Sequence, residues 1–109
     1  DWLTADDLDF YVNEFTQSGF AGPLNYYRNH NLTWELNANK PTQIHQPALF
    51  VAGERDGVIA MAGPALESMP NFVKDLRTNV LIPKIGHWTQ QEAPDAVNGY
   101  LLDWLAGLS

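Results

Sequence analysis

Two residues suited to acid–base chemistry follow two apolar runs of the sequence. Asp56 comes four residues after the run at residues 48–52, and His87 comes five residues after the run at residues 79–82. If the runs are neighbouring parallel strands, about 4.8 Å apart, loops of this length bring a carboxylate to an imidazole nitrogen. Such a carboxylate orients the histidine and stabilises the imidazolium formed when it takes a proton. Singly, each residue is more often structural, but together they predict the acid and the base of a catalytic triad.

A nucleophile to complete this triad is missing from the sequence. The three serines, Ser18, Ser68 and Ser109, lie outside the Gly-x-Ser-x-Gly pattern that places a nucleophile between a strand and a helix, and there is no cysteine. Residues 53–57 have glycines at this spacing, but the central residue is Arg55, which cannot attack a substrate. We therefore expect that the nucleophile lies outside these 109 residues or that the chain has none.

The composition narrows the classes of partner. A formal net charge of -7 is the wrong sign for binding nucleic acid or an anionic membrane surface. The absence of cysteine excludes disulfides and favours a reducing, cytoplasmic setting. We expect no metal and no cofactor, because His30 and His45 lack a ligand spacing and the acidic residues at 6, 7 and 9 fit the solvated first turn of a helix.

The expected elements begin with helices. Apolar residues recur every three or four positions between residues 8 and 15, with Thr4 placed to cap this helix and Gly19 placed to end it. Residues 24–29 form a second short helix in which Pro23 takes the first position. The two helices look like a paired unit.

A polar stretch at residues 37–47 reads as a linker, and a strand–helix–strand unit follows it. Residues 48–52 predict a strand covered on both faces, residues 63–69 a helix stopped by Pro70, and residues 79–82 a second, parallel strand. A final helix begins with Pro94 and should lie against the sheet through an apolar stripe, formed by Val97, Leu101, Trp104, Leu105 and Leu108.

Four stretches of the sequence carry a family resemblance. They read LDFYV at 8–12, SGFAGPLNYYRN at 18–29, PALFVAGERD at 47–56 and GHWTQQE at 86–92. In this order the chain resembles the C-terminal half of an epoxide hydrolase of the α/β-hydrolase fold, and the second and fourth stretches are specific to that family. The resemblance implies the end of a helical cap at residues 1–38 and, at residues 39–109, the last part of an α/β core of three layers.

The resemblance also implies roles for individual residues. Asp56 matches the triad acid, His87 the general base, and Tyr27 the cap tyrosine that binds the epoxide oxygen, while Tyr26 points elsewhere on the same helix. Val58 and Trp88 are expected beside the triad in the substrate pocket. The implied partners are an epoxide, water and a missing N-terminal half that carries an aspartate nucleophile and a second tyrosine.

Other interpretations of the same residues stay open. A haloalkane or haloacid dehalogenase of this fold uses the same acid and histidine, but needs no tyrosine hydroxyl to receive an alkoxide. A non-catalytic fragment or subunit that only binds a partner would also fit the lack of a nucleophile. The oligomeric state is open as well, with a homodimer among the options.

Overall fold

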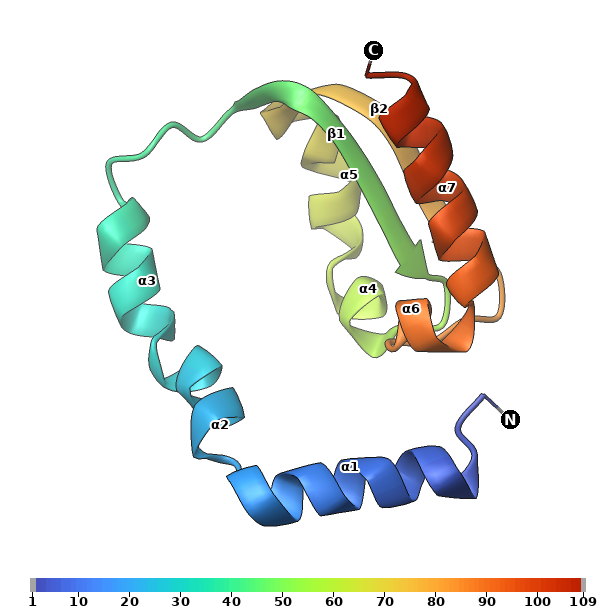
Figure 1. Ribbon diagram of the computed structural model, residues 1–109. Coiled ribbons are helices and arrows are strands. Elements are labelled where there is room, and N and C mark those ends of the chain that lie inside the picture. Colours follow the sequence, from blue (N-terminus) through green and yellow to red (C-terminus); the bar gives the residue numbers. More distant parts are fainter. Residues whose placement is uncertain (1, 109) are drawn as a thin grey trace. The chain divides into compact units, whose positions relative to one another are not determined.

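The computed structural model describes residues 2–108 and divides into two compact units, Asp1–Pro41 and Thr42–Ser109 (Figure 1). None of the helices in residues 2–108 combines the length and the apolar character needed to cross a membrane.

The first unit consists of helices α1 (Ala5–Ser18), α2 (Ala21–Arg28) and α3 (His30–Asn37). Thr4 caps α1 as predicted: its hydroxyl accepts the Asp7 N–H at 3.2 Å, and its own N–H donates to the Asp7 carboxylate at 2.9 Å. Gly19 ends the helix as predicted. Its φ of 65° lies in the left-handed region that favours glycine.

The second and third helices differ from the sequence prediction. α2 begins at Ala21, so Pro23 is its third residue, and the prediction that Pro23 takes the first position is wrong. Phe20 precedes the helix and stacks on Phe15, with ring centroids 4.6 Å apart, and no side-chain hydrogen bond caps the helix there. α3 follows after Asn29 alone and was not predicted, because it has no capping side chain or proline at its start.

The second unit is built on two parallel strands, β1 (Ile44–Gly53) and β2 (Val73–Ile82), which confirms the predicted pairing. Both strands begin earlier than their apolar runs, because the ladder extends into polar residues. Helices α4 (Gly57–Met61) and α5 (Gly63–Phe72) connect the strands. Pro70 lies inside α5, so the prediction that it stops the helix is wrong; near a helix end, a proline removes only one intrahelical hydrogen bond.

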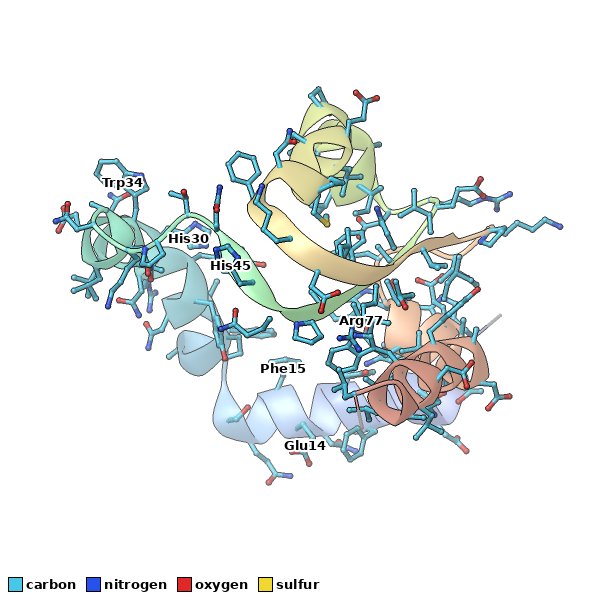
Figure 2. All side chains as sticks on the ribbon, turned by 90° about the horizontal axis from the view of Figure 1, so that it is seen from above. Glu14, Phe15, His30, Trp34, His45 and Arg77 are labelled. Atoms are coloured by element: carbon cyan, nitrogen blue, oxygen red, sulfur yellow. The ribbon has the colours of Figure 1, made fainter. Side chains whose placement is uncertain are left out.

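The chain ends in the short helix α6 (Thr89–Glu92) and the longer helix α7 (Pro94–Ala106). α5 contacts β2, α7 contacts both strands, and the two helices lie on opposite faces of the sheet (Figures 1 and 2). Arg77 of β2 donates to the carbonyl oxygen of Gly107 at 2.6 Å, which ties the end of α7 to the sheet.

The predicted apolar stripe of α7 is only partly covered. Val97 and Trp104 are half-buried, whereas Leu101, Leu105 and Leu108 remain exposed, because two strands form a sheet too narrow to cover three turns of helix. Few side chains of the unit are buried at all; among the apolar residues described, Ala52 and Ile82 are.

We expect the isolated 109-residue chain to bind a hydrophobic dye, because large apolar side chains face solvent in both units. Dye fluorescence measures this, and Leu102→Glu should lower it without loss of helix content, since Leu102 is 64% exposed. A monodisperse monomer that melts cooperatively and binds no dye would contradict the expectation.

Candidate active site

Asp56 and His87 meet where the two parallel strands end. Gly53 and Ile82 are paired at the ends of β1 and β2, so the loops that follow start level with each other. The Asp56 carboxylate accepts the Val58 N–H at 2.8 Å through Oδ1, and its Oδ2 lies 3.0 Å from Nδ1 of His87. One oxygen therefore caps α4 while the other holds the imidazole.

Backbone contacts hold the two loops against each other. The N–H of Glu54 donates to the Ile82 oxygen at 3.0 Å, and the N–H of Arg55 donates to the Ile85 oxygen at 2.8 Å. The Glu54 carboxylate accepts the N–H of Lys84 at 3.0 Å, where the backbone takes a positive φ of 67°. Together these bonds fix the distance between the carboxylate and the imidazole.

Gly53 makes this close approach possible. It is buried, and a methyl group on its Cα would overlap the carbonyl oxygens of Ile85 and Gly86. Any larger residue would push the histidine loop away from β1.

The environment of Asp56 keeps its carboxyl group ionised. Burial of this group, which is 8% exposed, raises its pKa, but the hydrogen bonds from Val58 and His87 and the attraction of a charged His87 outweigh the burial. The net effect is a pKa below its ordinary value of 3.8. The carboxylate is therefore available to stabilise an imidazolium at neutral pH.

His87 presents its ring to solvent beside an aromatic residue. The His87 side chain is 58% exposed, and its ring centroid lies 5.4 Å from that of Trp88 in an edge-on arrangement. Val58 and Trp88 are 52% and 56% exposed. Within residues 2–108, Nδ1 is the ring nitrogen of His87 with a hydrogen-bond partner, so Nε2 is the nitrogen left to accept a proton.

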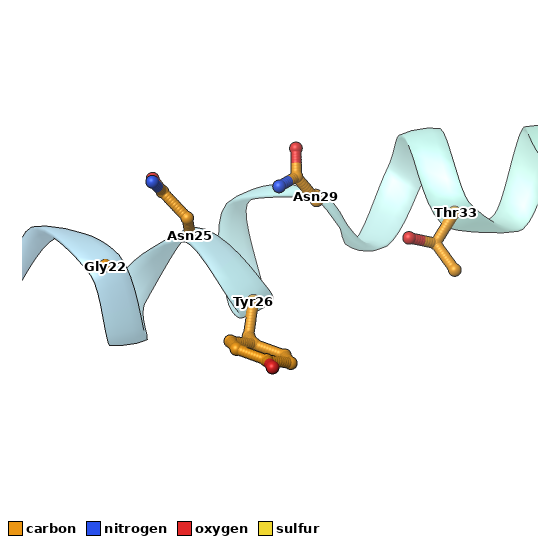
Figure 3. A pocket seen from close by; sticks show the side chains of 5 residues that line it. All are labelled: Gly22, Asn25, Tyr26, Asn29 and Thr33. Carbon is orange, nitrogen blue, oxygen red and sulfur yellow. The ribbon is translucent and has the colours of Figure 1, made fainter.

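Tyr27 lies on α2 in the first unit, whereas Asp56 and His87 lie in the second unit. It is 71% exposed, and its ring centroid lies 5.7 Å from that of His30. Tyr26, on another side of α2, lines an open hollow of about 300 Å³ together with Asn25, Asn29 and the other residues shown in Figure 3. The sequence did not predict this hollow.

Sequence reasoning missed two carboxylates that bind the loop around the histidine, one from the loop after β1 and one from α6. Glu54 binds the backbone of the loop after β2, and Glu92 binds the backbone on both sides of His87. Their positions within the matched stretches at 47–56 and 86–92 were the available signal. Among the described residues, no group of three or more His, Asp or Glu side chains is placed to hold a metal ion.

Replacement of Gly53 by alanine should lower the free energy of unfolding by about 1–3 kcal/mol, because the added methyl group has no space. Gly63→Ala is the matched control, since a methyl group there meets nothing within 4 Å. Urea unfolding of both variants measures the difference, and equal stabilities would show that the loops tolerate a wider spacing.

The lowered pKa of Asp56 predicts an acid-dependent contribution to stability. Because the folded state favours the carboxylate, the contribution is complete above the unfolded pKa and is lost as pH falls through the lower folded pKa. We expect the free energy of unfolding of the wild type to drop more steeply below pH 3.8 than that of Asp56→Asn, as measured by urea unfolding at several pH values. If the free energies of unfolding of both proteins fell equally with pH, the result would argue against a lowered pKa of Asp56.

The sequence is similar to those of curated epoxide hydrolases. A scan against protein-family models found no match. The chain is 41% identical over 98% of its length to epoxide hydrolase B of Mycobacterium tuberculosis and 39% identical to epoxide hydrolase A of the same organism, covering 30% and 33% of those proteins.

Solved structures that resemble this fold are also epoxide hydrolases. An epoxide hydrolase from an endophytic Streptomyces superposes with a TM-score of 0.91 at 44% identity, and epoxide hydrolase A of Mycobacterium thermoresistibile with a TM-score of 0.86 at 45% identity. The chain covers 33% of each of these structures. It thus spans about a third of the length of its relatives, and in sequence and fold it corresponds to the C-terminal part of the epoxide hydrolases of the α/β-hydrolase fold.

Proposed function

We propose that this chain supplies the acid–base part of an enzyme that opens epoxides to vicinal diols. The observation that carries the proposal is the 3.0 Å contact between Asp56 and His87 at the ends of two adjacent parallel strands. The similarity to proteins named epoxide hydrolase supports the choice of substrate class.

In the first step, an aspartate carboxylate outside this chain attacks an epoxide carbon. A carbon–oxygen bond forms to the aspartate, the ring carbon–oxygen bond breaks, and its electron pair stays on the epoxide oxygen. Tyr27 then acts as a hydrogen-bond donor to this oxygen and supplies its proton, which stabilises the charge that develops as the ring opens. The exposure of Tyr27 on α2 leaves its hydroxyl accessible for this role.

In the second step, His87 activates water. The ring takes a proton from water through Nε2 while the water oxygen attacks the ester carbonyl. The bond between the acyl carbon and the alkoxy oxygen then breaks, the alkoxy oxygen takes the proton that remains on the attacking oxygen, and the diol leaves with the aspartate restored as a carboxylate. The imidazolium returns its proton to the Tyr27 phenolate, directly or through solvent, which restores both groups. Asp56 stabilises the imidazolium, for which its lowered pKa suits it. Val58 and Trp88 line the space beside the histidine and contact the substrate; the exposure of both residues supports this role.

The proposed division of the chain places residues 1–38 in the helical cap and residues 39–109 in the core. The partner that completes the site is an N-terminal half that carries the nucleophile and covers the exposed apolar side chains of both units, such as Trp34 and Met61. A homodimer of this chain alone would leave the reaction without a nucleophile, so any such dimer would add to this partner and not replace it. A cytoplasmic setting, favoured by the cysteine-free sequence, belongs to the same proposal.

The full-length polypeptide that carries this segment should convert an aryl epoxide to its diol, and the 109-residue chain alone should not. Tyr27→Phe should lower turnover by about 10²-fold, the usual effect of losing one donor to a developing oxyanion. Tyr26→Phe is the matched control and should leave turnover near that of the wild type.

Three outcomes would change the proposal. Halide release from a haloalkane, with no diol from any epoxide, would assign the segment to a dehalogenase. Loss of turnover in Tyr26→Phe but not in Tyr27→Phe would exchange the two tyrosines. Diol formation by the 109 residues alone would show that they contain a nucleophile.

A further inference from the structure

The Glu92 carboxylate accepts hydrogen bonds from the backbone on both sides of His87, the candidate base. Its Oε2 accepts the N–H of Gly86 at 2.7 Å, and its Oε1 accepts the N–H of Trp88 at 3.1 Å. The two amides flank His87 directly. A single carboxylate therefore bridges the residue before the histidine and the residue after it.

Other hydrogen bonds hold the loop that carries His87 at Lys84, at Ile85 and at the oxygen of Gly86. Residues 83–88 form neither helix nor strand. The Thr89 hydroxyl, on a buried residue, donates to the Gly86 oxygen at 3.1 Å, and the Ile85 oxygen accepts the N–H of Arg55. The Glu92 carboxylate holds the N–H groups of Gly86 and Trp88, while the Trp88 oxygen accepts the N–H groups of Gln91 and Glu92 at 2.8 Å. Hydrogen bonds to a charged acceptor are stronger than neutral ones, so this side chain is well suited to hold the loop.

Capping of α6 alone does not account for this arrangement. A cap needs an acceptor for the first amides of the helix, and Trp88 lies directly before it. The shorter of the two bonds goes to Gly86, which lies outside the helix on the far side of His87.

The glycine at position 86 fits the same interpretation. A methyl group on its Cα would lie 2.9 Å from Oε1 and 3.2 Å from Oε2 of Glu92. The space beside Gly86 is thus filled by the carboxylate, and a larger residue would displace it.

We propose that Glu92 is a positioning residue for His87, which keeps the imidazole at Asp56 and Nε2 directed at the ester formed in the reaction. The inference rests on the proposed function for its kinetic consequence, although the geometry of the loop stands without it. Glu92 itself exchanges no proton with the substrate. Its loss should therefore slow the step that uses His87 and leave ester formation unchanged.

The test uses the full-length polypeptide and a single turnover of an aryl epoxide. Ester formation is followed by the intact mass of the protein, and ester hydrolysis by its decay. In Glu92→Gln, which leaves one acceptor oxygen, and in Glu92→Ala, which leaves none, hydrolysis should slow by about tenfold or more, the effect of losing a hydrogen bond to a charged acceptor, and the ester should accumulate. Glu67→Gln, on the exposed surface of α5, makes the same chemical change away from the loop and should behave as the wild type.

A second readout needs no substrate. The Nδ1 proton of His87 should give a low-field NMR signal that disappears in His87→Gln, and this signal should shift or broaden in Glu92→Ala but not in Glu67→Gln. Gly86→Ala should produce the same NMR change with the charge of Glu92 intact.

The results separate the two proposals. If the wild type forms no ester with any epoxide, the proposed function fails, and the NMR signal alone decides the role of Glu92. Unchanged hydrolysis and an unchanged signal in Glu92→Ala would overturn the positioning role. An equal fall in ester formation and hydrolysis would also overturn it, because general damage to the fold would then explain the effect.

Discussion

The close approach of two backbone segments beyond the strand ends underlies the arrangement of the site. β1 and β2 end level, and Gly53 lets the loop after β2 come within hydrogen-bonding distance of the loop after β1. The carboxylate of Asp56 and the imidazole of His87 are then brought together by loops too short to adopt many other conformations. The site is therefore a consequence of strand register more than of any single side chain.

Most of the second unit could be predicted from the sequence because its signals are local. Continuous apolar runs marked both strands, and Pro94 marked the start of the final helix. The acid and the histidine followed from their spacing after those runs. The strand starts could not be predicted, since the polar residues near Ile44 and Val73 join the ladder through their backbone, which carries no sequence signal.

The parts that the sequence did not predict depend on contacts between distant residues or on backbone geometry. Glu54 binds Lys84 across thirty positions of sequence, and no local pattern announces such a bond. The start of α2 lies beside a stack of Phe20 on Phe15 and leaves Pro23 at the third position of the helix, not at the first. The coverage of α7 depends on the width of the sheet, which a one-dimensional pattern does not contain.

Among the described residues, those that hydrogen-bond to His87 or to the loop that carries it lie between Gly53 and Glu92, within the second unit. Proton-transfer geometry is thus encoded separately from the helices of the first unit, where Tyr27 and the hollow beside Tyr26 lie. A substitution in those helices therefore removes none of the hydrogen bonds that hold Asp56 at His87.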